Sequence, residues 1–316
     1  MHRIRWAPAA LAALLCACAG LSACTGPSIG QAPGPRPSSA PASTRSEPAA
    51  PRVGATASPA ASRRADIAPG RGAASPPALP AAPGGGAARF SPTAAGPLRG
   101  KVVLVDPGHN GGNITAPSVI DRLIWNGRET ETCDTTGART DGGYTEALFN
   151  WNVARYLAAD LRAEGATVVL TRTSNTGTGP CVTTRANVGN AARANAAVSI
   201  HADGGPPGGR GFAILEPVAD GINDAIIRPS AILGADLRTA FAAGTGEPVS
   251  TYDGINGIQP RSDLAGTNLS TVPKVFIECA NMRNAADAAL VTSARWQARA
   301  ARAIAAGLSA FLTAAG

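Results

Sequence analysis

Short apolar runs alternate with longer segments of helical periodicity between residues 99 and 316. Nearly continuous apolar runs predict buried strands, and apolar residues three or four positions apart predict amphipathic helices. The predicted strands are 100–108, 166–172, 196–203, 211–217 and 273–280, and the predicted helices are 145–165, 185–196, 228–243 and most of 286–314, with an interruption. This alternation is typical of the α/β class. We expect a single three-layer domain with a central, mostly parallel, twisted sheet flanked by helices on both faces.

The helix predicted at 145–165 has the clearest apolar stripe. Its apolar positions are Leu148, Val153, Leu157 and Leu161. Gly165 follows directly and suits the residue after a helix, where a left-handed conformation is common. The stripe predicts one face packed against the sheet.

The first 98 residues show neither pattern. Basic residues precede a short apolar run that ends in small residues, which is typical of a secretory signal peptide. The sequence LSAC at 21–24 resembles a bacterial lipobox, which implies acylation of Cys24. The alternative is an ordinary signal peptide and a secreted protein. We expect an exported protein at the extracytoplasmic face of the membrane or in the cell envelope, whose only membrane contact is a lipid anchor at Cys24.

The segment that follows the leader is rich in Ala, Pro and Gly and has almost no large apolar side chains. Such a segment cannot bury enough surface to offset its ordering entropy. The predicted organisation is a signal peptide of the lipoprotein type at 1–23, a disordered tether at 24–98 and the folded domain at 99–316.

Charge and cysteine content refine this organisation. The net charge of +7 is carried by residues 1–98, so the folded part is neutral and no nucleic-acid partner is expected. Cys133 and Cys181 lie in polar, turn-rich segments, and in an exported protein they are expected to form a disulfide. Cys279 lies inside an apolar strand and is expected to be a buried free thiol.

Three chemically capable side chains lie at or near predicted strand ends. They are His109 after "VVLVDPG", His201 in "SIHAD" and Glu278 in "VFIE". Ligands bind beyond the carboxyl ends of strands in open α/β sheets. Two histidines and a carboxylate suit a zinc site with an open fourth position. Spacing alone leaves the third ligand open among four carboxylates: Glu278, Asp106, Asp203 and Glu146.

Five segments in order resemble a known family across about 100–310. They are "VVLVDPGHNGGN", the Glu that opens the next helix, "VVLTRTSN", "RANVGNAARANAAVSIHAD" and "VPKVFIECANMRN". Together they resemble the zinc-dependent N-acetylmuramoyl-L-alanine amidases of the amidase type 3 family, with features of its actinobacterial, mycobacterium-like branch. The folded domain would then be a zinc amidase catalytic domain.

The resemblance implies roles for individual residues. His109, Glu146 and His201 match the ligands of one Zn²⁺, and Glu278 matches the catalytic glutamate. Possible substrate-contacting or supporting positions are Asp106, Arg172, Arg185 and Asn284. Many members have Gly-Phe after the catalytic Glu, where this chain has Cys279-Ala280-Asn281, so its fine specificity stays open.

The implied reaction is hydrolysis of the amide between the lactyl group of N-acetylmuramic acid and L-alanine of peptidoglycan stem peptides, in cell-wall remodelling, division or turnover. Zinc would activate a water, and Glu278 would take its proton and pass it to the departing amine. The expected partner is peptidoglycan or a muropeptide, bound by a monomer. The competing hypotheses are a binding lipoprotein without turnover and another zinc hydrolase, such as a deacetylase of wall sugars. The segment 110–143 is either a lid, substrate wall or regulatory element, or a variable surface excursion pinned by the disulfide.

Overall fold

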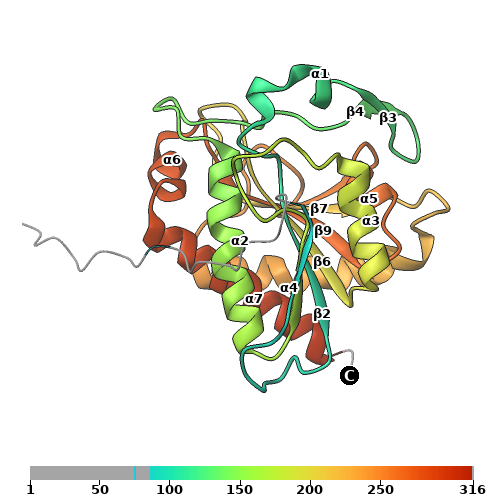
Figure 1. Ribbon diagram of the computed structural model, residues 1–316. Helices are drawn as coiled ribbons and strands as arrows, with labels where there is room; N and C mark the ends of the chain where they lie inside the picture. Colours follow the sequence, from blue (N-terminus) through green and yellow to red (C-terminus); the bar gives the residue numbers. More distant parts are fainter. Residues whose placement is uncertain (1–74, 76–85, 315–316) are drawn as a thin grey trace, which may run out of the picture. The chain divides into compact units, whose positions relative to one another are not determined.

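The computed structural model describes Ser75 and residues 86–314, and this part of the chain is organised around a seven-stranded sheet (Figure 1). The strands follow the spatial order β1-β5-β2-β6-β9-β7-β8. Their bounds are β1 Ala88–Phe90, β2 Val102–Pro107, β5 Thr167–Leu170, β6 Ala196–Asp203, β7 Ala213–Pro217, β8 Ile258–Arg261 and β9 Lys274–Asn281. The strands β5, β2, β6 and β9 are parallel, as are β7 and β8, whereas β1 and β7 run antiparallel to β5 and β9.

Helices cover both faces of this sheet (Figure 1). The helices α2 (Glu146–Ala163), α4 (Ile227–Thr245) and α7 (Ala294–Ala314) cover one face, and α3 (Val182–Ala192) and α5 (Ala265–Asn268) lie on the other. The short helix α6 (Ala285–Val291) joins β9 to α7, which accounts for the predicted interruption. This arrangement confirms the predicted fold class. None of the helices in the described ranges is long and apolar enough to cross a membrane.

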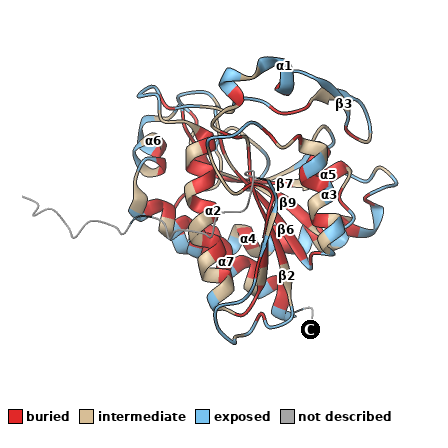
Figure 2. Ribbon diagram, viewed as in Figure 1, coloured by how far each residue is buried: buried red, intermediate tan, exposed pale blue. Residues whose placement is uncertain are grey.

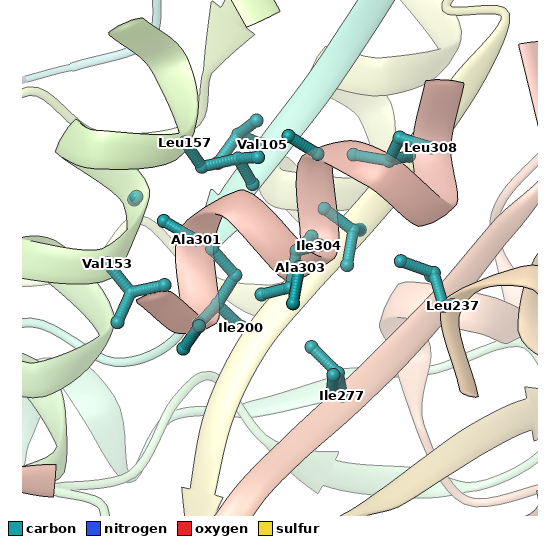
Figure 3. Close-up of a cluster of buried hydrophobic side chains, with 14 of the residues drawn as sticks. Val105, Val153, Leu157, Ile200, Leu237, Ile277, Ala301, Ala303, Ile304 and Leu308 are labelled. Carbon is teal, nitrogen blue, oxygen red and sulfur yellow. The ribbon is translucent and has the colours of Figure 1, made fainter. Parts of the chain in front are cut away.

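The period of two along the strands divides the core between the two faces. In β2, Val103 and Val105 belong to the large cluster under α2, α4 and α7, and Leu104 belongs to a smaller cluster on the α3 face. The large cluster interleaves residues of the sheet and helices, as Figure 3 shows for Val105, Ile200 and Ile304. The strands are therefore buried along the middle of the molecule (Figure 2).

Helix α2 follows the predicted pattern with one shift. Its buried stripe runs through Phe149, Val153, Leu157 and Leu161 at intervals of four residues, and Leu148 is only partly buried. Gly165 has a φ of 96° directly after the helix, which confirms the predicted helix end.

The folded part begins earlier than the sequence indicates. Strand β1 pairs with β5, Phe90 is buried, and Leu98 is fully buried in the same core cluster as α2. Residues 88–98, which the sequence assigned to the tether, therefore pack against the central sheet and α2 in the structure. The predicted signal peptide, Cys24, and residues 24–74 and 76–85 of the predicted tether lie outside the described residues.

The segment between β2 and α2 stands apart from the central sheet. It contains the 3-10 turn Asn113–Thr115, α1 (Pro117–Ile120), and a separate hairpin of β3 (Leu123–Trp125) and β4 (Thr130–Thr132). A further 3-10 turn, Asp224–Ile226, precedes α4. Cys133 and Cys181 form a disulfide, and Cys279 is a buried free thiol. Both cysteine predictions are thus confirmed, and the bridge ties the hairpin segment to the start of α3.

Candidate active site

Two histidines and one glutamate converge at the carboxyl edge of the sheet. His109 follows β2, His201 lies near the end of β6, and Glu146 is the first residue of α2. One ligand-type atom of each lies within 4.8 Å of the others. Because β2 and β6 are adjacent and parallel, their carboxyl ends deliver both histidines to one place. Of the four candidate carboxylates, Glu146 is the one that the fold brings to the histidines.

The carboxylate of Glu146 is buried and fixed from several sides. Its Oε1 lies 3.1 Å from Nε2 of His109 and 2.9 Å from Nδ1 of His201. Its Oε2 accepts a hydrogen bond of 2.7 Å from the backbone N–H of Ala138. Burial opposes its charged form, but the two histidines outweigh burial and hold the pKa of Glu146 well below its usual range. A single oxygen is therefore presented between the two imidazole rings.

The second ring nitrogen of His109 is also engaged. Its Nδ1 lies 3.3 Å from Oδ1 of Asp134 and 3.2 Å from the carbonyl oxygen of Thr135. Burial would lower the pKa of His109, but Glu146 and Asp134 raise it to about 10. A histidine held in this way at Nδ1 has a fixed ring orientation, and its Nε2 is directed toward Glu146.

Two glycines leave the room that this arrangement needs. A Cβ at Gly108 would lie 2.1 Å from the His201 ring. A Cβ at Gly137 would lie 2.7 Å from Cδ2 of His109 and 2.8 Å from Oε2 of Glu146, and Gly137 has a φ of 73°. Only glycine allows the backbone to approach these side chains so closely.

Glu278 lies beside this cluster on β9. Its Cα is paired with that of His201 across the parallel strands β6 and β9. Its Oε2 is buried and has no hydrogen-bond partner among the described residues. Burial, with Glu146 and Asp203 nearby, raises the pKa of Glu278 well above its usual range. A carboxyl group of this kind is suited to accept and return a proton.

A cavity of about 460 Å³ joins these groups. Its walls include the cluster of His109, Glu146 and His201, together with Glu278, Asp203, Arg261 and the apolar side chains of Leu264 and Phe276. The Phe276 ring stacks on the His201 ring, with centroids 5.3 Å apart. The cavity therefore combines a polar floor with an apolar wall, as small-molecule and peptide sites commonly do.

The structure places Asp106 and the two predicted arginines behind His109. Asp106 is 2% exposed and contacts Arg185 and Lys274 at 3.0 and 3.2 Å. Burial raises its pKa, but these two cations lower it well below the usual range. Arg172 is fully buried and donates to the carbonyl oxygens of Pro107, Gly108 and Ala147.

The remaining predicted residues lie farther along the edge. Asn284 caps α6, since its side-chain oxygen accepts hydrogen bonds from the backbone N–H groups of Ala286 and Asp287. Asp203 lines the cavity that contains Glu278 and is not part of the three-residue cluster.

Sequence reasoning missed Asp134 and Phe276. Asp134 lies in an irregular segment after β4, and only its position next to Cys133 could have drawn attention to it. Phe276 precedes Glu278 by two residues on β9, so both point to the same face of the sheet. That period could have identified Phe276 as a residue of the site.

The fold and the site define an α/β protein with a histidine and carboxylate site at the carboxyl edge of its sheet. The profile of the family described as N-acetylmuramoyl-L-alanine amidase matches residues 103–310. This chain therefore belongs to the N-acetylmuramoyl-L-alanine amidase family, whose members are hydrolases.

Individual relatives agree with the family. An N-acetylmuramoyl-L-alanine amidase of Mycobacterium tuberculosis is 41% identical over 216 residues, which are 68% of this chain and 88% of the relative. The crystal structure of the amidase Ami1 of Mycobacterium smegmatis is similar, with a TM-score of 0.66, 41% identity, and coverage of 69% of this chain and 99% of that chain. The apo form of Ami1 from Mycobacterium abscessus gives a TM-score of 0.64 and 39% identity, with 68% and 99% coverage.

Proposed function

We propose that this chain hydrolyses the amide bond between the lactyl group of N-acetylmuramic acid and L-alanine of peptidoglycan stem peptides, with one Zn²⁺ held by His109, Glu146 and His201. The observation that carries the proposal is the convergence of these three side chains beside Glu278 in one cavity. Family membership supports the amide of peptidoglycan as the substrate.

The residues present fit zinc. Two imidazole nitrogens and a carboxylate oxygen form a ligand set of the catalytic type, in which a fourth position stays open. His109 also has the carboxylate partner that metal-binding histidines usually have on their other nitrogen, here Asp134. When bound, zinc would polarise the scissile carbonyl and activate a water near neutral pH.

Glu278 would perform the proton transfers. Its unpartnered Oε2 would take a proton from the attacking water and return it to the nitrogen of L-alanine as the amide bond breaks. Burial raises the pKa of Glu278 well above its usual range, so its carboxylate is a stronger base toward the attacking water than an exposed glutamate would be. Leu264 and Phe276 would exclude water from the apolar side of the reacting group.

The proposal is tested by turnover of muramoyl-peptide by the whole chain. Glu278→Gln should lower turnover by about 10²–10⁴-fold, as expected for loss of a general acid–base group, and should keep zinc bound. Glu216→Gln is a matched control, because this half-buried glutamate of β7 faces Gly234 of α4. Chelation should abolish turnover, and added zinc should restore it.

The products distinguish the competing hypotheses. Free stem peptide supports the amidase, acetate indicates a deacetylase, and binding without product indicates a protein that only holds its ligand. Full turnover by Glu278→Gln would contradict the role given to Glu278. We further propose that the protein acts outside the cytoplasm, in wall remodelling, division or turnover, as a monomer that is anchored through Cys24 or secreted. Metabolic labelling with a fatty acid, compared with Cys24→Ala, tests the anchor.

A further inference from the structure

The His109 ring is oriented by a segment distant from its own strand. The backbone of His109 has a φ of 56°, which is unusual for a residue with a side chain. One ring nitrogen faces Glu146, and the other faces Asp134 at 3.3 Å and the carbonyl of Thr135 at 3.2 Å. The ring direction therefore depends on where Asp134 and Thr135 lie.

Asp134 is itself held by a buried cation. Its side chain is 3% exposed, and its Oδ2 accepts a hydrogen bond of 3.1 Å from Arg185. Arg185, 4% exposed, also donates to Asp106 at 3.0 Å and to the carbonyl oxygen of His109 at 2.9 Å. One guanidinium group thus fixes both the backbone of His109 and the acid that orients its ring.

The disulfide joins the two segments that carry this acid and this cation. Cys133 directly precedes Asp134, and Cys181 is the N-cap of α3, which carries Arg185. Their Cα atoms are 4.7 Å apart. The backbone N–H of Val182 also donates to the carbonyl oxygen of Cys133 at 2.8 Å. Among the described strands, β3 and β4 pair only with each other. No strand pairing with the central sheet therefore fixes the position of this hairpin.

We propose that Asp134 is a positioning residue for His109, and that the Cys133–Cys181 disulfide holds Asp134 against the ring and thereby sets the zinc affinity of the site. The inference rests on the proposed zinc site. A carboxylate on Nδ1 fixes the tautomer in which Nε2 carries the free electron pair, and such partners typically contribute about 10–100-fold to metal affinity. The alternative is a disulfide that only stabilises a surface excursion.

The test measures the zinc dissociation constant by competition with a chromophoric chelator. The proteins are the wild type, Asp134→Ala, Asp134→Asn, the Cys133→Ser/Cys181→Ser double variant, and the double variant combined with Asp134→Ala. Glu247→Gln is the matched control, because Glu247 is also buried and paired with an arginine, Arg210 at 2.9 Å, but contacts neither histidine. Circular dichroism reports whether each variant is folded.

We expect Asp134→Ala to weaken zinc binding by about 10–100-fold. Asp134→Asn should lose less, because its amide oxygen can still accept a hydrogen bond from Nδ1 of His109. The disulfide variant should weaken zinc binding in the same direction, and combining it with Asp134→Ala should add little, because both changes act through one contact. The amidase activity of the disulfide variant should recover when zinc is present in excess.

Several outcomes overturn the inference. Wild-type zinc affinity in Asp134→Asn and in the disulfide variant would do so, as would full additivity of the two changes or an equal loss in Glu247→Gln. If Asp134→Ala does not fold, Asp134→Asn and the disulfide variant decide the matter. A wild type that binds no zinc refutes the proposed metal site together with this inference. A wild type that binds zinc and hydrolyses muramoyl-peptide, with unchanged affinity in the variants, refutes the inference alone.

Discussion

The close approach of Gly108 to the His201 ring makes Gly108→Ala a sharp test of the site. A Cβ at this position would lie 2.1 Å from Cε1 and 2.3 Å from Nε2 of His201. The φ of Gly108 is outside the left-handed range, so alanine strains no backbone dihedral there. The substitution therefore acts through a single contact with a proposed metal ligand.

The size of the effect follows from that contact. Nonbonded carbon atoms rest at about 3.5–4.0 Å, so the His201 ring must retreat by more than about 1 Å. Metal–ligand distances tolerate only about 0.2 Å, and a misplacement of about 1 Å in an active site costs about 100-fold in rate. We expect weaker zinc binding, a turnover at least about 100-fold lower, and a free energy of unfolding lower by about 1–3 kcal/mol from overpacking.

Three measurements on Gly108→Ala separate these effects. Chelator competition gives the zinc affinity, muramoyl-peptide hydrolysis gives the turnover, and urea denaturation of the metal-free protein gives the free energy of unfolding. Gly208→Ala is the matched control, because a Cβ at Gly208 would meet no atom within 4 Å. Wild-type zinc affinity and turnover in Gly108→Ala would refute the assignment of His201 as a ligand.

Other predictions concern the buried network, the first strand and a second glycine. Burial raises the pKa of Asp106, but two cations depress it, so its contribution to stability is full above the unfolded pKa of about 3.9 and is lost as the pH falls below it. Urea denaturation of Asp106→Asn should therefore give a lower free energy of unfolding than the wild type at neutral pH. Between about pH 4 and 2 the variant should lose less of this free energy than the wild type does, and an equal pH dependence in the two proteins would contradict the prediction. A chain that begins at Arg99 loses the buried Phe90 and Leu98, so its free energy of unfolding should fall by about 1.5–3 kcal/mol for each side chain, and equal denaturation midpoints for the two lengths would disprove the docking of β1. Gly137→Ala should weaken zinc binding, because its Cβ would meet His109 at 2.7 Å in a left-handed backbone conformation. A zinc dissociation constant equal to that of the wild type, measured by chelator competition, would contradict this prediction.

The sequence was sufficient for the parts of the fold that have strong periodicity. Short, nearly continuous apolar runs such as those around β2, β6 and β9 predict buried strands, and parallel strands bring their carboxyl ends to one edge. His109, His201 and Glu278 could therefore be expected near one another. The order of the strands was not predictable in this way, because the longer strands share a similar apolar pattern and this pattern does not specify which strand lies beside which.

Short strands and residues in irregular segments escaped prediction for a different reason. The strands β1, β3 and β4 have three residues each, too few to show a period of two. Asp134 lies in an irregular segment after β4, and its contact with His109 joins residues 25 positions apart in the sequence. Contacts of this kind are set by tertiary packing, and local sequence carries almost no signal for them.

The network behind the site explains how a backbone segment with an unusual φ can hold His109, a proposed metal ligand, in place. A non-glycine residue at positive φ persists where its surroundings leave it no alternative. Arg172 and Arg185 donate to the three successive carbonyl oxygens of Pro107, Gly108 and His109, so the turn is fixed by two buried cations. These cations need a buried anion, which Asp106 supplies to Arg185 at 3.0 Å. The ring of His109 is thus aimed by the same charged cluster that stabilises the end of β2, and substitutions in that cluster should affect stability and zinc affinity together, whereas Glu278→Gln should affect turnover alone.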